Sequence, residues 1–182
     1  MERKLVVING SYCRNGYTKK CLDKEAERLR KKYKIQEIRY FFLDNQLVGC
    51  LHHQKCQIGC VVRDQFQEIA TEIEGAERVL FGSPVYLDFP SPKLLAFLSR
   101  LSCYSENTQR EFFRDKKAHF LATAYCSGTK TVIHILMGAC EMLGFTIEGR
   151  SSKEYIQLWQ DRKIRGGMKP EDACYLEREE IK

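Results

Sequence analysis

Short apolar runs alternate with segments of helical periodicity along the chain as far as Gly149. The runs predict strands buried on both faces, at residues 4–9, 35–43, 78–82, 117–122 and 145–148. Between them, apolar residues recur every three to four positions, which predicts helices at residues 18–33, 64–74, 92–102 and 131–143. This alternation favours an α/β fold, with a parallel sheet covered by helices on both faces.

The length of the chain fits one domain. We expect a single domain over residues 1–182, with a core over about 4–149 and a C-terminal extension over 150–182. The periodicity fades in the extension, although Pro170 suits the start of a last helix that runs to about Glu180. Hydrophobic residues make up 43% and charged residues 30%, which is ordinary for a globular chain and argues against disorder.

Several features bear on location and partners. No apolar run approaches the roughly 20 residues of a membrane-spanning helix, and the N-terminus lacks a secretory signal pattern, so we expect a cytoplasmic protein with no membrane partner. The net charge of +6 favours anionic ligands, and its densest cluster, at residues 28–34, suits the solvated end of a helix better than a nucleic-acid surface. In that compartment the nine cysteines are expected to be reduced.

The connection between the first predicted strand and helix has the composition of a phosphate site. It reads Gly10-Ser11-Tyr12-Cys13-Arg14-Asn15-Gly16-Tyr17-Thr18. Glycines allow a tight turn that presents backbone N–H groups, and the helix offers its positive N-terminus to an anion. Ser11 and Thr18 add hydroxyl donors, and Arg14 adds a charge-assisted fork. Ligands of parallel sheets bind at the carboxyl ends of the strands, where the loops 83–91 and 123–129 also lie.

Three other kinds of loop fit this segment less well. A P-loop NTPase needs a lysine where this chain has Tyr17. A dinucleotide-binding fingerprint needs a glycine where it has Tyr12. A small tyrosine phosphatase needs an arginine six residues after its cysteine, and Lys19 holds that place after Cys13. A glycine-rich turn with a purely structural role stays open.

A second motif, Gly82-Ser83-Pro84-Val85-Tyr86, ends the third predicted strand. With the first loop it resembles the NADPH-dependent FMN reductase family, and in particular its iron–sulfur flavoprotein-like branch. In that family the loops run G-S-x-R-x-x-G-x-T and G-S-P-V-Y. The second loop is matched at every position, and the first at Gly10, Ser11, Gly16 and Thr18, with Arg14 one place after the family's arginine. The resemblance covers roughly residues 4–149. It implies a flavodoxin-like three-layer sandwich with a five-stranded parallel sheet in the order 2-1-3-4-5.

The resemblance also implies an FMN site built from three loops. The residues expected at the phosphate are Ser11, Arg14, Asn15, Gly16, Tyr17 and Thr18. Those expected around the flavin ring are Ser83, Pro84, Val85, Tyr86, Leu87, Thr123, Tyr125, Cys126, Ser127 and Gly128. No catalytic side chain is expected, because the flavin carries the redox chemistry. The chain departs from the family at Leu95, usually a lysine, and at Ser99, usually the aspartate of an Asp-Arg pair of which Arg100 remains.

A group of potential metal ligands precedes the second helix. Cys50, His53, Cys56 and Cys60 stand where the iron–sulfur flavoproteins carry a compact cysteine run, with a histidine in place of one cysteine. Three thiolates and an imidazole suit zinc and are also compatible with an iron–sulfur cluster. A remnant that binds no metal is the favoured interpretation.

These features together favour an FMN-dependent oxidoreductase that takes hydride from NAD(P)H and reduces a quinone, a flavin or another small acceptor. The resemblance implies a homodimer or homotetramer. Two alternatives stay open: an electron-transfer protein of the iron–sulfur flavoprotein type without its own small-molecule substrate, and a flavodoxin-like domain that has lost its flavin.

Overall fold

The computed structural model describes residues 3–53, 60–108, 113–125 and 127–154 of the chain. Along the sequence the elements are β1 (Lys4–Asn9), α1 (Tyr17–Tyr33), β2 (Glu37–Phe42), α2 (Phe66–Glu74), β3 (Arg78–Pro84), α3 (Pro92–Thr108), β4 (Lys117–Ala124), α4 (Thr129–Met142) and β5 (Thr146–Glu154). The possible helix that begins at Pro170 lies outside the described residues.

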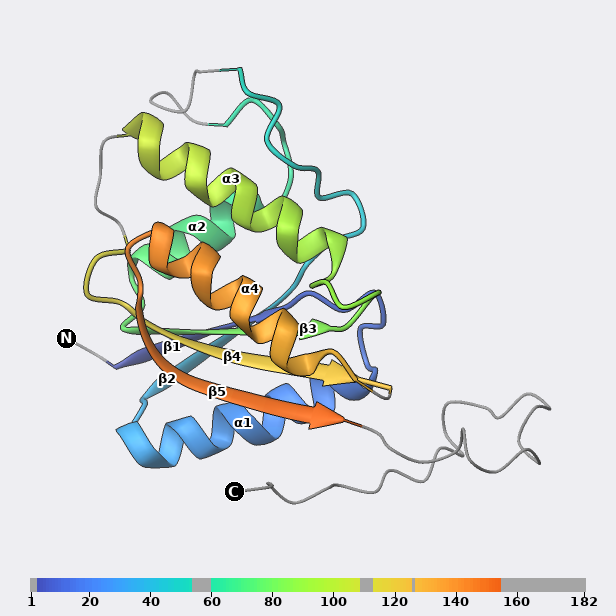
Figure 1. Ribbon diagram of the computed structural model, residues 1–182. Helices are drawn as coiled ribbons and strands as arrows, with labels where there is room; N and C mark the ends of the chain where they lie inside the picture. Colours follow the sequence, from blue (N-terminus) through green and yellow to red (C-terminus); the bar gives the residue numbers. More distant parts are fainter. Residues whose placement is uncertain (1–2, 54–59, 109–112, 126, 155–182) are drawn as a thin grey trace.

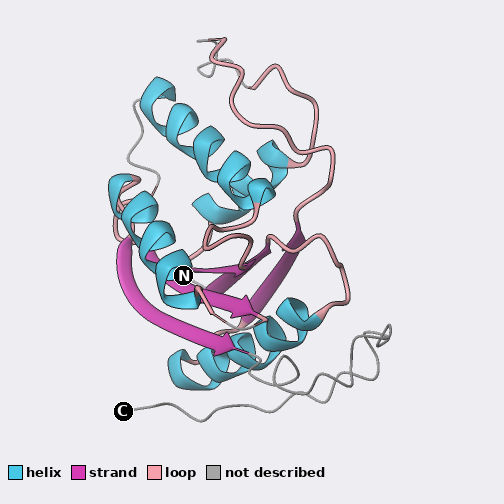
Figure 2. Cartoon of the chain, turned by 45° about the vertical axis from the view of Figure 1, so that its right-hand side comes forward, coloured by secondary structure: helices cyan, strands magenta, loops and turns pink. Residues whose placement is uncertain are grey.

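The strands form one parallel sheet in the order β2-β1-β3-β4-β5. Figure 1 shows α1 below this sheet and α2, α3 and α4 above it. Figure 2 shows the same layers after a turn about the vertical axis. The three-layer sandwich and the strand order predicted from the sequence are therefore confirmed.

Two apolar cores explain why the strand runs are continuous. In β1, Leu5 and Val7 pack against α1, whereas Val6 and Ile8 pack into the larger core under α2, α3 and α4. Successive side chains of a strand point to opposite faces, so a strand covered on both faces must be apolar at every position. The edge strand β2 lacks this constraint, and Arg39 and Tyr40 in it are exposed.

Four elements extend beyond their predicted ends: β3 and β4 by two residues each, and α3 and β5 by six residues each. α3 continues to Thr108, and β5 runs to Glu154, past the expected end of the core at Gly149. The pairing of β4 with β5 shifts register between Ala118 and His119. The second half of β5 is polar and gives no apolar strand pattern, but its backbone still pairs with β4.

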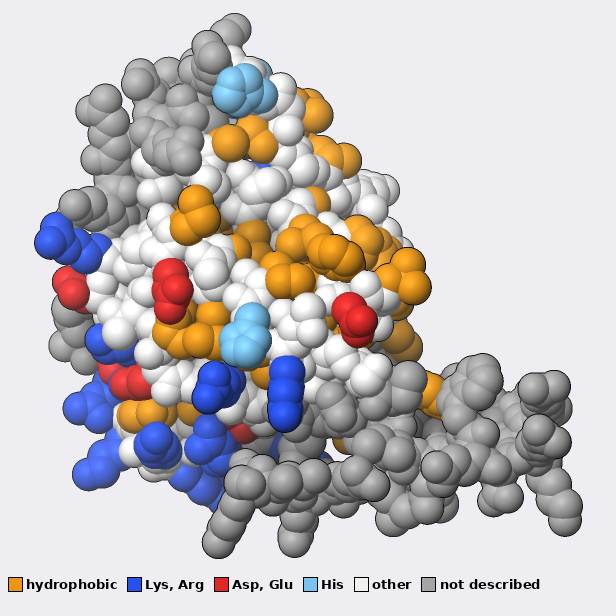
Figure 3. All heavy atoms as spheres, viewed as in Figure 1, with side chains coloured by type: hydrophobic (Ala, Val, Ile, Leu, Met, Phe, Trp, Pro, Cys, Tyr) orange, Lys and Arg blue, Asp and Glu red, His pale blue; other side chains and the backbone are white. Residues whose placement is uncertain are grey.

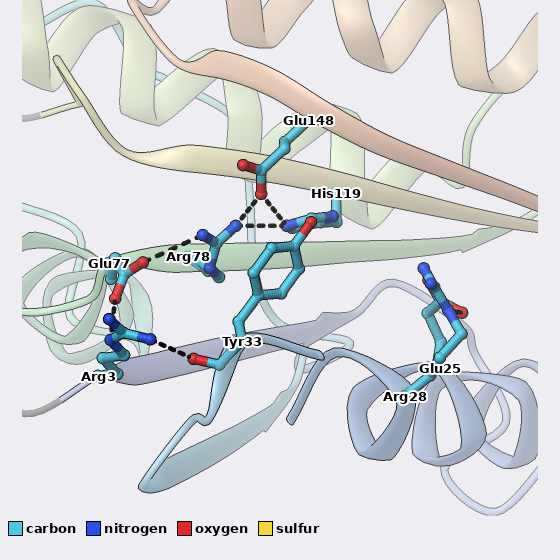
Figure 4. A network of polar contacts seen from close by, with 8 residues as sticks. All are labelled: Arg3, Glu25, Arg28, Tyr33, Glu77, Arg78, His119 and Glu148. Carbon is cyan, nitrogen blue, oxygen red and sulfur yellow. Dashed lines mark hydrogen bonds and ion pairs between the residues drawn. The ribbon is translucent and has the colours of Figure 1, made fainter. Parts of the chain in front are cut away.

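A polar network ties the elements together at the amino ends of the strands (Figure 4). The guanidinium of Arg78 in β3 lies 3.5 Å above the ring of Tyr33, pairs with Glu148 of β5, and is 3.3 Å from Nε2 of His119 in β4. Arg78 and His119 are buried. Because this network lies at the opposite end of the sheet from the carboxyl edge, it braces the sheet and leaves that edge to other residues.

Among the described residues, every helix is too short or too polar to cross a membrane.

Candidate functional site

Three loops meet at the carboxyl ends of the strands. The N–H of Gly10 donates to the carbonyl of Gly82 at 2.9 Å, which joins the first loop to the end of β3. The N–H of Val85 donates to the carbonyl of Thr123 at 2.8 Å, which joins the second loop to the third. The three segments predicted to surround a flavin are therefore neighbours in the structure.

The first loop is shaped by its own hydrogen bonds. The amide oxygen of Asn9 accepts the N–H of Ser11 at 3.0 Å, and Ser11 Oγ accepts the N–H of Cys13 at 3.0 Å. The N–H of Gly16 then donates to the carbonyl of Cys13 at 3.2 Å. The sequence predicted that the hydroxyl of Ser11 would bind the phosphate. In the structure Ser11 is buried, and its Oγ stabilises the loop.

The same loop leaves a set of donors for an anion. Within the described residues, no hydrogen bond engages the N–H groups of Tyr12, Arg14 and Asn15. They precede the N-terminus of α1, whose first turn carries no acidic residue. A concentration of N–H groups at a helix N-terminus, with no carboxylate beside it, suits a phosphate.

The side chain of Thr18 is buried. Its Oγ1 lies 2.8 Å from Oγ1 of Thr123, and both side chains are buried. The predicted phosphate donor Thr18 is therefore engaged with a residue predicted to lie near the flavin ring. The pair pins the start of α1 to the end of β4.

Basic and aromatic side chains gather beside this loop. The guanidinium carbon of the exposed Arg14 is 4.7 Å from the centre of the Phe42 ring. Nζ of Lys93 is 4.4 Å from the centre of the same ring and 4.5 Å from the centre of the Tyr12 ring. Lys93 was not predicted, because a lysine in the first turn of a helix has no sequence signature of burial.

The second loop is a tight reversal that displays its tip. Tyr86 and Phe89 exchange backbone hydrogen bonds of 2.9 Å, and Leu87 and Asp88 between them have φ of 49° and 62°. Two consecutive positive φ values are the mark of a type I′ turn. Ser83 is buried, and its Oγ accepts the N–H of Ser91 at 2.8 Å. Ser83 therefore holds the loop in shape.

The third loop fits closely against the second. Gly128 has φ of 90°, and a Cβ atom there would overlap Oδ1 of Asp88 and lie 2.9 Å from Cγ1 of Val85. Only glycine combines this backbone conformation with this approach. Tyr125 and Ser127 are exposed at the rim, and Cys126 lies outside the described residues.

Aromatic and aliphatic side chains from the three loops form an exposed rim, which we call the aromatic lip. Its members are Tyr12, Tyr86, Leu87, Phe89 and Tyr125. Leu87 is 95% exposed, and the rings of Tyr12 and Tyr86 meet edge to face at 6.0 Å. Partial burial, with Tyr12 and Cys13 nearby, raises the pKa of Tyr86. Figure 3 shows hydrophobic side chains gathered beside the start of α3.

The predicted metal ligands are only partly described. Sγ of Cys60 is 3.8 Å from Nε2 of His53 and accepts a hydrogen bond from Arg100 at 3.0 Å. Cys56 lies outside the described residues, and the described part of the chain contains no group of three or more side chains suited to a metal. Arg100 also pairs with Asp64 at 2.5 Å.

Residues 3–151 match the family model described as NADPH-dependent FMN reductase. The chain belongs to this family. The resemblance to this family noted from the two loop motifs is thereby confirmed. No curated protein matches the sequence.

Solved structures share the fold of this FMN reductase family member. RosB with bound 8-demethyl-8-formylriboflavin-5'-phosphate has a TM-score of 0.66 at 15% identity, covering 84% of this chain and 65% of its own, so this chain spans just under two thirds of RosB. The Trp repressor binding protein from Bacillus subtilis has a TM-score of 0.61 at 18% identity, with coverages of 85% and 88%. The apo form of an NADH:FMN oxidoreductase has a TM-score of 0.61 at 18% identity, with coverages of 84% and 74%. At such identities these likenesses show the fold alone.

Proposed function

We propose that the protein binds FMN at the carboxyl edge of its sheet and passes electrons from NAD(P)H to a small acceptor such as a quinone or a second flavin. The observation that carries the proposal is the anion site of the first loop. The unengaged N–H groups of Tyr12, Arg14 and Asn15 precede the N-terminus of α1, beside the exposed guanidinium of Arg14.

The residues present fit both ends of FMN. The loop offers N–H donors and a cation to the phosphate, and family membership supports that assignment. Beside it, the aromatic lip offers an apolar surface to a planar ring. Pro84 and Val85 precede Tyr86 on the same loop and are half-buried, which suits contact with one side of the ring.

The side chains at the carboxyl edge indicate what the cofactor does and what the protein does. When bound, FMN supplies the acceptance of hydride and its onward transfer. The protein binds the phosphate through the first loop, positions the ring between the second and third loops, and leaves the lip open to a second planar molecule. A small-molecule acceptor and an FMN-bound homo-oligomer both belong to this proposal.

Titration with FMN and with riboflavin tests the proposal, because riboflavin lacks the phosphate. We expect FMN to bind at least tenfold more tightly than riboflavin. Arg14→Ala should weaken FMN by roughly 10- to 100-fold, the value of a charge-assisted hydrogen bond, and should leave riboflavin unchanged. Equal affinity for the two flavins, or equal losses in the variant, would overturn the assignment of the phosphate loop.

Reduction of the loaded protein tests the activity. Addition of NADPH or NADH under anaerobic conditions should bleach the visible flavin absorbance within seconds, and a quinone should restore it. An FMN-loaded protein that neither nucleotide reduces would contradict the reductase. Iron and sulfide in the purified protein would favour the electron-transfer alternative.

A further inference from the structure

Lys93 carries a buried charge that forms no ion pair with a carboxylate among the residues that the structure describes. The side chain is 3% exposed, and its Nζ donates to the carbonyl of Leu43 at 2.7 Å and to the amide oxygen of Asn45 at 3.0 Å. Both acceptors are neutral, and no ion pair links Lys93 to another described residue. Burial lowers the pKa of Lys93, while Asp44 raises it and Arg14 lowers it further.

The place of Lys93 in its helix adds to the cost of this charge. It lies in the first turn of α3, which contains no acidic residue. The positive end of a helix dipole favours anions and disfavours cations. A buried cation at a helix N-terminus therefore destabilises the fold through both its burial and the helix dipole. Such unfavourable placements occur mainly at functional sites.

The charge lies directly behind the aromatic lip. Nζ of Lys93 is 4.5 Å from the Tyr12 ring, and that ring meets the ring of Tyr86 at 6.0 Å. Arg14 also lies over the ring of Phe42, and the proposed function places the FMN phosphate at Arg14. The phosphate would balance the charge of Arg14, whereas Lys93 would keep its own charge beside the Tyr12 ring.

We propose that Lys93 stabilises the negative charge that the site gains when its flavin is reduced. This inference rests on the proposed function. Hydride transfer breaks a C–H bond of the nicotinamide and forms an N–H bond on the flavin, so two electrons and one proton move. The reduced ring therefore carries one more negative charge than the oxidised ring. A fixed cation in a dry environment lowers the free energy of that anion without touching it.

Two substitutions remove the charge by different routes. Lys93→Met deletes the ammonium, and Asn45→Asp neutralises it by placing a carboxylate 3.0 Å from Nζ at an exposed position. The matched control is Lys116→Met, at the amino end of β4. Nζ of Lys116 also donates to two carbonyls, those of Glu74 at 2.6 Å and Ala76 at 2.9 Å, and burial also lowers its pKa.

The measurement is the ratio of the dissociation constants for oxidised and reduced FMN, obtained by anaerobic titration of each variant. We expect Lys93→Met and Asn45→Asp to weaken reduced FMN about tenfold more than oxidised FMN. For two electrons this is a lowering of the midpoint potential by about 30 mV. Lys116→Met should leave the ratio unchanged. If Lys93→Met does not fold, Asn45→Asp decides the matter by itself.

The outcomes separate this inference from the proposed function. If the wild-type chain binds FMN, a ratio within twofold of wild type in Asn45→Asp, or an equal change in Lys116→Met, overturns the role of Lys93 and leaves the proposed function standing. If the wild-type chain binds neither oxidised nor reduced FMN, the proposed function fails and this inference fails with it.

Discussion

The hydroxyl oxygens of Thr18 and Thr123 lie 2.8 Å apart, although 105 positions separate the two residues in the sequence. The contact is buried, so each hydroxyl is the partner that the other needs. It joins the first helix to the fourth strand next to the loops at the carboxyl edge of the sheet. The geometry of the predicted phosphate site thus depends on a residue that is distant from it in the sequence.

Thr18→Val should destabilise the protein by about 1–3 kcal/mol, because it leaves the hydroxyl of Thr123 buried without its partner. The double variant Thr18→Val/Thr123→Val should recover part of that loss, since both polar groups are then removed. Urea unfolding of the wild type, the two single variants and the double variant measures this coupling. Strictly additive losses would show that the two hydroxyls do not interact.

Gly128→Ala should destabilise the protein by about 1–3 kcal/mol and weaken FMN binding at least tenfold. Alanine at a φ of 90° is strained, and its Cβ would collide with Asp88 of the second loop. Gly138→Ala is the matched control, because nothing lies within 4 Å of a Cβ at that position in α4. It should stabilise the helix by about 0.5–1 kcal/mol and leave FMN binding unchanged. Similar effects at the two glycines would refute the close fit of the loops.

The free energy of unfolding should fall as the pH drops from about 6.5 to about 4, in part because of His119. Burial, followed by the charge of Arg78, lowers the pKa of His119 from 6.5 to about 4. Arg78 also holds the carboxylate of Glu148, so that carboxylate is not left to stabilise an imidazolium. Between these pH values the unfolded chain binds the proton more tightly than the folded chain, so stability rises with pH. At about 1.4 kcal/mol per pKa unit the effect amounts to about 3 kcal/mol.

Urea unfolding at several pH values, in wild type and in His119→Gln, isolates this contribution. The variant keeps a hydrogen-bonding side chain but loses the titration, so its stability should depend less steeply on pH. Parallel pH profiles would show that other groups cause the acid sensitivity.

Arg100→Met should destabilise the protein by about 3–5 kcal/mol, because it leaves the Asp64 carboxylate, whose side chain is only 9% exposed, without its cation. Replacing both charges, in Arg100→Met/Asp64→Leu, should cost much less than the single change. Thermal and urea unfolding of the set provide the check. A double variant no more stable than Arg100→Met would mean that Arg100 acts through another contact, such as Cys60.

The fold and the three loops at the carboxyl edge of the sheet were predictable because they depend on local rules. Continuous apolar runs such as that of β1 follow from burial on both faces of a parallel sheet. The residues from Gly10 to Thr18 carry a turn and a helix start in adjacent positions, so their arrangement follows from the chain itself. The end of β5 was not predicted. Its residues are polar, and they pair with β4 through backbone groups, which leave no pattern in the side chains.

The strand segments, the loops at the carboxyl edge and the family resemblance could all be inferred from the sequence alone, because they follow from periodicity and adjacent residues. The tertiary structure decided how individual side chains are used. Thr18 contacts Thr123, Ser83 holds its own loop, Asp64 pairs with Arg100, and Lys93 is buried beside Tyr12. Such pairings depend on the distances that the packed sheet and helices impose between residues far apart in the chain, and no local pattern encodes those distances.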